Sequence, residues 1–261
     1  MSKGVSINPA NSLSVLYGKG VFTTIAIRNW EPFLWEKHWR RLSSNAAKLE
    51  IDISAYDERS VLNALAGVIE NNKVTNGRAR ITFLDESPGE IWSSPGEKKT
   101  SLSIITAGPR KIPDMFKLTI SPHRVNTTSP LLGIKSCNYL EHLMVYDEAK
   151  GCGFEEAVRL NERGEIASAC LANIFWVKGE KFYTPSLKTG CLAGTTREFV
   201  FEKLDCEQVE LGLDALNEVE AIFLTSAGVG VAVVSEFNGK RLLTNHLKLF
   251  TEEIRSLFFS G

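Results

Sequence analysis

The setting of Lys135 suggests that this lysine takes part in covalent chemistry. It follows the apolar residues 131–134, so we expect it at the rim of a core rather than on a solvated helix face. Partial loss of hydration would lower the pKa of its ammonium group, and the neutral amine is the form that attacks a carbonyl carbon to give an imine. A lysine in this position can also cover apolar surface with its methylenes while its charge stays in water.

A second set of residues has the chemistry to bind an anion. Arg41 lies beside the apolar face of a helix predicted over residues 34–49, where the pattern alone indicates an exposed arginine, whose planar guanidinium suits a bidentate anion. Further along the chain, Thr195 and Glu198 have the spacing of a capping box. The pattern is that of a well-formed helix start, and the amide groups and dipole of such an end also favour a phosphate.

Hydrophobic spacing and turn residues indicate how the first part of the chain positions these side chains. We expect strands over residues 21–27, 78–84 and 100–106, and helices over residues 34–49 and 57–71. The polar loop at residues 85–99 contains two Pro-Gly pairs, and loops of this length are often functional. Residues 107–112 are the expected linker between two domains.

The second part of the chain is predicted to mix strands and helices around Lys135. Strand 117–121 comes first, and a helix should run from about residue 139 to Gly151, where the glycine would cap its C-terminus. The remaining predicted elements are a hairpin of residues 156–161 and 165–177, a helix from residue 195, a strand over 221–226, a strand or turn over 229–237, a turn at Asn238 and Gly239, and a helix over 245–258.

Composition excludes several classes of partner. The chain has 261 residues, 43% of them hydrophobic, which is enough to bury a full core in one large or two small domains. Its 30 basic and 31 acidic residues nearly cancel, so neither nucleic acid nor an anionic membrane is an expected partner. The five cysteines show no metal-binding pattern, so we expect no bound metal. With no secretory leader at Met1 and no long apolar run, we expect a cytoplasmic protein with free, mostly buried thiols.

Five segments of the chain resemble, in order, the class IV (fold type IV) pyridoxal-phosphate enzymes. These segments are YGKGVFTT (17–24), GIKSCNYL (133–140), EAKGCGFEEAVRLNERGEI (148–166), ANIFWV (172–177) and YTPSLKTGCLAGTTRE (183–198). The family includes branched-chain aminotransferases, D-amino-acid aminotransferases and 4-amino-4-deoxychorismate lyases. The resemblance implies an α+β (α/β) two-domain fold of the D-amino-acid aminotransferase type. Its small α/β N-terminal domain would span residues 1–106, and its larger pseudo-barrel C-terminal domain, which binds the cofactor, would span residues 113–261.

The resemblance also implies pyridoxal 5'-phosphate as the cofactor and roles for individual residues. Lys135 would form the imine with the cofactor and then act as a general base. Arg41 belongs to the HxxRL motif at residues 38–42. It would bind the cofactor phosphate together with the LxGxTR motif at residues 192–197. The further cofactor-binding residues implied are Tyr139, Asn173, Gly194, Thr195, Thr196, Ser226 and Ala227. The family pattern leads us to expect a homodimer with the cofactor between the domains and a small amino compound as the substrate.

One position departs from the family pattern. The family has a glutamate that pairs with the ring nitrogen of the cofactor, four residues after the hairpin glycine, whereas this chain has Ser168 four residues after Gly164. A hydroxyl can hydrogen-bond the ring nitrogen but cannot stabilise its protonated form as a carboxylate does, which weakens transamination more than elimination. Two other interpretations stay open. Either Glu165 substitutes through a shifted register, or the protein binds the cofactor without turnover.

Two short sequence motifs favour a lyase over an aminotransferase. Residues 22–24 (FTT) and 224–228 (LTSAG) resemble the lyase form of these motifs. In that form, a threonine of the first motif and the lysine transfer protons. Thr23 or Thr24 would take that role here, unless both simply fill a strand. Against a lyase, the loop at residues 85–99 lacks the arginine associated with a substrate carboxylate in that enzyme; Glu90 or its neighbours stand there.

We therefore expect a lyase of the 4-amino-4-deoxychorismate lyase type, which releases pyruvate and forms 4-aminobenzoate in folate biosynthesis. The alternative is a class IV aminotransferase acting on D-amino or branched-chain amino acids. A degenerate protein that binds pyridoxal phosphate without turnover is the second alternative. An amino donor alone would convert the cofactor of an aminotransferase to its amine form, a half-reaction that Ser168 should slow.

Overall fold

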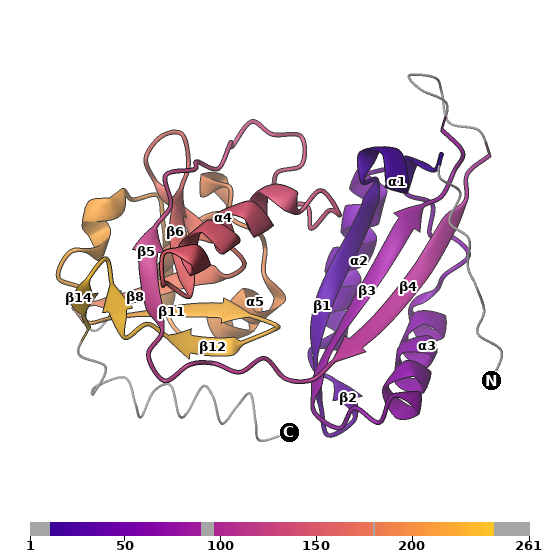
Figure 1. Ribbon diagram of the computed structural model, residues 1–261, viewed down its shortest axis with the longest axis horizontal. Coiled ribbons are helices and arrows are strands. Elements are labelled where there is room, and N and C mark those ends of the chain that lie inside the picture. The colour runs from indigo at the N-terminus through magenta and orange to yellow at the C-terminus, as the bar shows by residue number, and fades with distance from the viewer. Residues whose placement is uncertain (1–10, 90–96, 180, 243–261) are drawn as a thin grey trace. The chain divides into compact units, whose positions relative to one another are not determined.

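The computed structural model describes residues 11–89, 97–179 and 181–242, which belong to two compact units (Figure 1). The first unit comprises Met1–Gly108 and Ile134–Asn138, and the second comprises Pro109–Gly133 and Tyr139–Gly261. The prediction from sequence puts Lys135 in the C-terminal domain, whereas the structure groups its segment with the first unit. Backbone pairing with a strand of the first unit accounts for this grouping.

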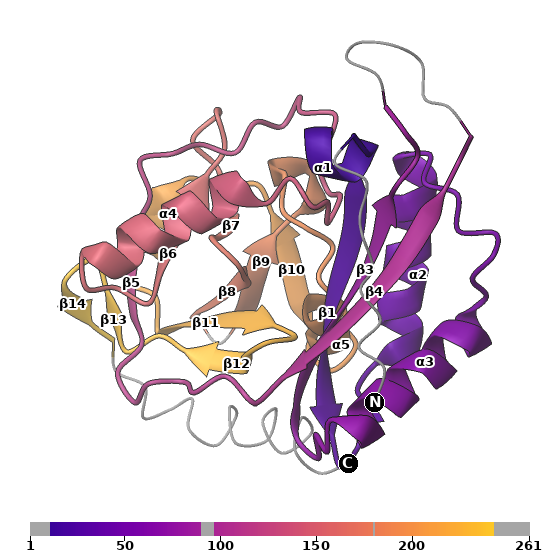
Figure 2. The ribbon, with the colours of Figure 1, turned by 45° about the vertical axis from the view of Figure 1, so that its right-hand side comes forward.

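The first unit is an antiparallel sheet with helices α2 and α3 on one face (Figure 2). Its strand order is β2-β1-β3-β4. The strands are β1 (Gly20–Arg28), β2 (Glu31–Pro32), β3 (Gly77–Asp85) and β4 (Thr100–Ala107), and the helices are α1 (Leu13–Tyr17), α2 (Trp35–Lys48) and α3 (Glu58–Asn71). The strands and helices predicted for residues 21–106 are all present, with ends that differ by at most one residue.

Apolar spacing explains why α2 and α3 pack on this sheet. The buried residues recur at three- and four-residue intervals, and they are Trp35, His38, Leu42, Asn45 and Ala46 on α2, and Val61, Leu65 and Ile69 on α3. The apolar ones meet apolar residues of β1 and β3 in one core. Helix α3 begins where the Asp57 carboxylate accepts a hydrogen bond from the Ser60 amide at 2.7 Å. These contacts hold α2, and with it Arg41, against β1.

Alternation along β1 sends its two threonines to opposite faces of the sheet. Thr23 shares the helix-covered face with the core residues Val21 and Ile25. Thr24 lies on the other face, where it stands opposite Arg80 of β3 in the antiparallel register. The two threonines that the sequence leaves as equal candidates therefore have different neighbours.

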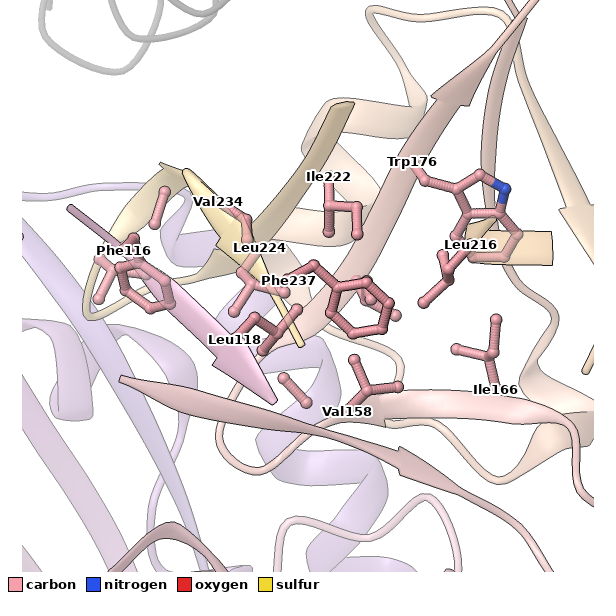
Figure 3. Packing of buried hydrophobic residues seen from close by; sticks show 14 of the residues in the cluster. Phe116, Leu118, Val158, Ile166, Trp176, Leu216, Ile222, Leu224, Val234 and Phe237 are labelled. Carbon is pink, nitrogen blue, oxygen red and sulfur yellow. The ribbon is translucent and has the colours of Figure 1, made fainter. Parts of the chain in front are cut away.

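The second unit contains two five-stranded sheets around a common core. Their strand orders are β10-β9-β8-β11-β12 and β14-β13-β5-β6-β7. The strands are β5 (Lys117–Ile120), β6 (Glu156–Leu160), β7 (Ile166–Ala169), β8 (Asn173–Lys178), β9 (Lys181–Pro185), β10 (Cys206–Val209), β11 (Ala221–Ser226), β12 (Gly230–Val233), β13 (Glu236–Phe237) and β14 (Lys240–Arg241). Helices α4 (Leu140–Gly151) and α5 (Thr195–Phe201) contact β6 and β11, and short 3-10 helices lie at Leu187–Thr189 and Leu213–Leu216. The core joins Trp176 from one sheet with Val158 and Phe237 from the other (Figure 3).

The second strand of the predicted hairpin, residues 165–177, is interrupted in the structure. It breaks at residues 170–172, so β7 belongs to one sheet and β8 to the other. A backbone amide within the break donates to the Glu156 carboxylate at 3.2 Å, a partner that the strand ladder does not supply. The prediction of one continuous strand is therefore wrong, and the chain crosses between sheets just before Asn173.

Two predicted helix ends also differ from the structure. Gly151 does not cap α4, because it is the last helical residue and the left-handed conformation falls on Gly153 (φ 84°). The capping box predicted at residues 195–198 is wrong as well. The extended Gly194 occupies the N-cap position, and a glycine has no side chain with which to cap the helix. Thr195 therefore lies in the first turn of α5 rather than before it.

The turn predicted at Asn238 and Gly239 joins β13 to β14, and residues 229–237 contribute β12 and β13. The helix predicted over residues 245–258 lies outside the described residues. Within the described ranges, no helix is long and apolar enough to cross a bilayer. The same ranges contain no group of three or more His, Cys, Asp or Glu side chains placed to hold a metal ion. The five cysteines are free thiols, and three of them are buried.

Candidate active site

Lys135 lies in a short segment that pairs with the start of β1. The Phe22 amide donates to the Lys135 carbonyl at 2.9 Å, and the Cys137 amide donates to the Gly20 carbonyl at 2.8 Å. The residue between them forms a bridge to β1 as well. These bonds fix the backbone at the lysine, while its side chain stays half-buried.

The amine of Lys135 lies near an aromatic ring and two guanidinium groups. Its Nζ atom is 4.6 Å from the centre of the Phe22 ring. Burial, followed by the positive charges of Arg41 and Arg80, lowers the pKa of Lys135 to about 7. A large share of this lysine is therefore neutral amine near pH 7, which is the form that imine chemistry requires.

Arg80 is a member of this cluster that the sequence did not reveal. It lies on the same face of the sheet as Phe22, and its guanidinium carbon is 3.5 Å from the centre of that ring. Its Nε donates to the Thr82 hydroxyl at 3.3 Å, and its Nη2 is 4.0 Å from the Cys137 sulfur. The register between β1 and β3 brings Arg80 here, and no local sequence pattern specifies that register.

Thr23 joins His38 and Arg41 on the helix-covered side of the sheet. Its hydroxyl is 2.6 Å from His38 Nδ1 and accepts a hydrogen bond from Arg41 Nη2 at 2.9 Å. Burial, followed by the charges of Arg41 and Lys135, holds the pKa of His38 well below its usual value, so the imidazole is neutral. Thr23 and Arg41, two residues singled out in the sequence, are therefore in direct contact, and the charge of Lys135 acts on the histidine that they share.

In the second unit, Asn173 holds the loop that leads into α5. Its side-chain amide donates to the Leu192 carbonyl at 2.9 Å. A Cβ atom on Gly194 would lie 2.0 Å from Asn173 Oδ1, so glycine is what allows the loop to approach this closely. Thr195 and Thr196 follow in the first turn of the helix, and both are buried. Asn173 therefore sets the position at which α5 begins.

Thr225 of β11, which the sequence did not single out, lies beside Asn173. It stands opposite Asn173 in the β8–β11 register, so the two side chains share a face of the sheet. Its side chain is buried, and its hydroxyl has no hydrogen-bond partner among the described residues. Ser226 ends the strand and Ala227 begins the turn after it. A buried hydroxyl without a partner is costly, so this group fits a polar ligand that would supply one.

Ser168 is half-buried on β7, and its partner in the antiparallel register is Arg159 of β6. The Arg159 guanidinium is buried, where it contacts His142 Nδ1 at 2.9 Å and donates to the Arg124 carbonyl at 3.3 Å. It also forms an ion pair with the Glu141 carboxylate. A cation, rather than a carboxylate, therefore accompanies the serine on this face of the sheet.

Glu165, the acid considered as a substitute for the missing glutamate, is engaged elsewhere. Its carboxylate accepts hydrogen bonds at 2.7 Å from Arg163 and from the Asn161 amide, in the turn between β6 and β7. These hydrogen bonds lower the pKa of the Glu165 carboxyl from its usual value. A register shift that brought Glu165 to the position of Ser168 would break this turn, so the structure gives the shift no support.

Tyr139 occupies the N-cap position of α4 without capping the helix through its side chain. Its ring centroid is 4.4 Å from that of His142, the residue that contacts Arg159. Tyr139 is therefore linked by direct contacts to the cation that stands opposite Ser168.

Comparison with known proteins shows that a single family spans the candidate residues of both units. Residues 20–237 match the family described as amino-transferase class IV. The protein therefore belongs to the class IV aminotransferase family. Enzymes of this family depend on pyridoxal phosphate, so the chain is a pyridoxal-phosphate-dependent enzyme.

Individual relatives carry two different activities. An aminodeoxychorismate lyase from Bacillus subtilis is 29% identical over 222 residues, which are 81% of this chain and 75% of that protein. The structure of 4-amino-4-deoxychorismate lyase from Pseudomonas aeruginosa matches with a TM-score of 0.84 at 18% identity, covering 98% of this chain and 96% of that one. Branched-chain amino acid aminotransferase from Escherichia coli matches with a TM-score of 0.86 at 21% identity, covering 99% and 89%. These matches confirm the fold type IV architecture, but the fold does not choose between the two reactions.

Proposed function

We propose that this protein is a lyase of the 4-amino-4-deoxychorismate lyase type, which releases pyruvate and forms 4-aminobenzoate. The observation that carries the proposal is the pairing of Ser168 with the buried Arg159, which leaves no carboxylate at the position where the family pattern has one. A ring nitrogen that is not protonated accepts less negative charge, which penalises transamination more than elimination. The 29% identity to the Bacillus subtilis lyase supports the same conclusion.

The roles of the phosphate-binding and base residues follow from their chemistry. When it is bound through Lys135, pyridoxal phosphate supplies an electron sink for bond cleavage next to the substrate nitrogen. Arg41 would bind its phosphate, since a guanidinium is an anion partner, and the family resemblance implies the same role for residues 194–196, at a helix start whose amide groups favour an anion. Once the substrate amine has displaced it from the cofactor, Lys135, whose pKa is about 7, would take the proton from the carbon that bears the amino group. The electron pair of that C–H bond would expel the substituent on the adjacent carbon as the enolate of pyruvate, which would become pyruvate by taking up a proton.

Arg80 and Thr24 complete the proposed machinery. Arg80 compensates for the arginine that the loop at residues 85–99 lacks, because its guanidinium lies beside Phe22, as the Lys135 amine does. A substrate carboxylate is the natural partner of such a guanidinium. Thr24 stands opposite Arg80, and we propose its hydroxyl as the one that handles protons together with Lys135.

The aminotransferase alternative keeps its support from the fold, which this chain shares with the Escherichia coli branched-chain enzyme. It requires that an amino donor alone convert the bound cofactor to its amine form. The alternative without turnover predicts that the protein binds the cofactor through Lys135 but converts neither aminodeoxychorismate nor an amino donor.

A homodimer is part of the proposal, and the exposed face of α4 supports it. Leu140 and Met144 are 68% and 64% exposed, and Leu143 between them is 44% exposed. Large apolar side chains gathered on one helix face mark a surface for interaction. Light scattering of the purified protein tests this point, and the mass of a single chain would contradict it. The small amino substrate and the cytoplasmic location stay predictions from the sequence.

The absorption spectrum of the purified protein with added pyridoxal phosphate tests the proposed function. Lys135→Ala removes the reactive amine, and Lys188→Ala is the matched control because that side chain is 82% exposed. We expect a visible band in wild type and in Lys188→Ala that is lost in Lys135→Ala, and pyruvate release from aminodeoxychorismate that exceeds turnover of amino donors. A wild-type protein without the band contradicts the cofactor chemistry. Turnover of amino donors without pyruvate release would replace the lyase by the aminotransferase.

A further inference from the structure

The hydroxyl of Thr23 has two hydrogen-bond partners in the described part of the chain. Arg41 Nη2 lies 2.9 Å from Oγ1, and His38 Nδ1 lies 2.6 Å from it. Thr23 is 0% exposed, so water does not compete for either position. Both partners come from α2, one turn apart, whereas Thr23 comes from β1. The three residues therefore tie the helix to the strand through a single oxygen atom.

The proton of this hydroxyl can be placed from the chemistry of the two partners. A guanidinium only donates hydrogen bonds, so Arg41 occupies a lone pair of Thr23 Oγ1. His38 Nδ1 is then the acceptor within reach for the proton of the hydroxyl, and an accepting nitrogen carries no proton of its own. His38 is therefore a neutral imidazole with its proton on Nε2.

Burial, followed by the charges of two cations, keeps the His38 imidazole in this state. Arg41 on the same helix and Lys135 on the segment 134–138 are the cations whose charges act on it. A positive charge on the imidazole would face both of them in a buried site. The hydrogen bond from Thr23 to His38 thus persists through the pH range in which an exposed histidine titrates.

We propose that His38 is a positioning residue for Arg41. By accepting the Thr23 proton, His38 turns a lone pair of Oγ1 toward the guanidinium and fixes the group that holds the cofactor phosphate. The inference rests on the proposed function only for this role of Arg41. It also removes Thr23 from proton transfer, because the proton of its hydroxyl is bound by His38 and its oxygen is held by a cation. Thr24, on the opposite face of the sheet, is the threonine left to handle protons.

The tautomer of His38 tests the hydrogen-bond chain without any cofactor. Long-range nitrogen-15 spectra of the wild-type protein, assigned with the His38→Gln variant, should show a neutral imidazole protonated at Nε2 from about pH 6 to about pH 8. A proton on Nδ1, or protonation of both ring nitrogens within this range, overturns the proposal.

The effect on Arg41 is tested by comparing Thr23→Val with Thr23→Ser. Valine keeps the shape of the side chain and removes the hydroxyl, whereas serine keeps the hydroxyl. We expect the Kd for pyridoxal phosphate to rise about tenfold in Thr23→Val, as for a lost hydrogen bond to a charged group, and to stay near the wild-type value in Thr23→Ser. Equal binding by wild type and Thr23→Val would show that Arg41 does not depend on Thr23, and would overturn the proposal.

These outcomes separate the inference from the proposed function. If the wild-type protein binds no pyridoxal phosphate, the proposed function fails and the role of Arg41 fails with it, while the His38 tautomer still decides the hydrogen-bond chain. If Thr23→Val does not fold, His38→Gln and His38→Phe give the same comparison. A glutamine oxygen can accept the Thr23 proton and should preserve binding, whereas phenylalanine cannot accept it and should weaken binding. Equal binding by these two variants would count against the positioning role.

Discussion

Arg159 of β6 lies directly opposite Ser168 of β7, and residues paired in this way present their side chains on the same face of a sheet. The guanidinium is buried and is held by contacts with His142, Glu141 and the Arg124 carbonyl. A positive charge is thus built into the face on which the family pattern leads us to expect a carboxylate. The departure from the family pattern therefore involves both Ser168 and Arg159, and an experiment that tests it has to change both residues.

Ser168→Glu should shift the enzyme toward transamination, because a carboxylate stabilises a protonated ring nitrogen. Arg159 would compete for the new carboxylate, so the double variant Ser168→Glu with Arg159→Leu should show the larger effect. We expect the half-reaction with an amino donor to become about tenfold faster in the double variant, which corresponds to about 1.4 kcal/mol. Single-turnover absorption measures this rate, with Ser168→Ala as the control. An unchanged half-reaction in both glutamate variants would show that position 168 does not act on the ring nitrogen.

Replacing Arg80 should raise the pKa of Lys135, because one of the two positive charges that oppose its protonation is lost. Arg80→Met keeps a long apolar side chain, and Arg78→Met is the matched control on the same strand. Competitive labelling of Lys135 with acetic anhydride over a pH series, read by mass spectrometry, gives the pKa in the cofactor-free protein. The value should lie above about 7 in Arg80→Met and stay unchanged in Arg78→Met. A lower value in Arg80→Met is incompatible with the electrostatic argument.

The lowered pKa of Lys135 should make the cofactor-free protein more stable as the pH rises. The pKa is 10.5 in the unfolded reference and about 7 in the folded protein, so between these values the unfolded state binds more protons. The contribution of this lysine to the free energy of unfolding therefore becomes more favourable as the pH rises from 7 toward 10.5. Below pH 7 the buried lysine is charged, and its destabilising effect on the folded state is greatest.

Lys135→Met removes this pH-dependent contribution. Urea unfolding at about pH 7 and about pH 9.5 should show the variant more stable than wild type at the lower pH, with a smaller advantage at the higher pH. A difference between the two proteins that is the same at both pH values would contradict a lowered lysine pKa.

Gly194→Ala should destabilise the second unit and weaken cofactor binding. The new Cβ would lie 2.0 Å from Asn173 Oδ1, and relieving such a clash costs about 1–3 kcal/mol. Gly67→Ala on α3 meets no atom within 4 Å and should instead stabilise the protein by about 0.5–1 kcal/mol. Thermal unfolding and the Kd for pyridoxal phosphate are to be measured for both variants. If Gly194→Ala binds the cofactor as tightly as wild type does, the loop before α5 has no part in the site.

Local patterns in the sequence predict the elements of the first unit better than they predict its site. Helices α2 and α3 are predictable because buried residues such as Leu42 and Leu65 recur at helical spacing. Lys135 can be recognised in the sequence because apolar residues precede it and because the segment around it resembles a family motif. Arg80 and Thr225 do not stand out, because each owes its place to strand register, which depends on contacts between distant segments.

Tertiary contacts also explain two of the local predictions that are wrong. Residues 165–177 have the composition of one strand, but the Glu156 carboxylate on a neighbouring strand binds a backbone amide and helps to turn the chain. Thr195 has the spacing of a helix cap, but the close approach of Gly194 to Asn173 moves the N-cap one residue earlier. Neither partner lies within the local window from which these predictions are made.

The grouping of residues 134–138 with the first unit limits how the chain can be divided. A fragment that stops at Gly108 would lack this segment, and the backbone groups of Gly20 and Phe22 that pair with it would lose their partners. Exposed strand edges invite pairing with other chains, so such a fragment should aggregate unless residues 134–138 are supplied with it. The linker is therefore no place for truncation, because the segment that carries Lys135 is also a structural part of the unit on the other side of the cut.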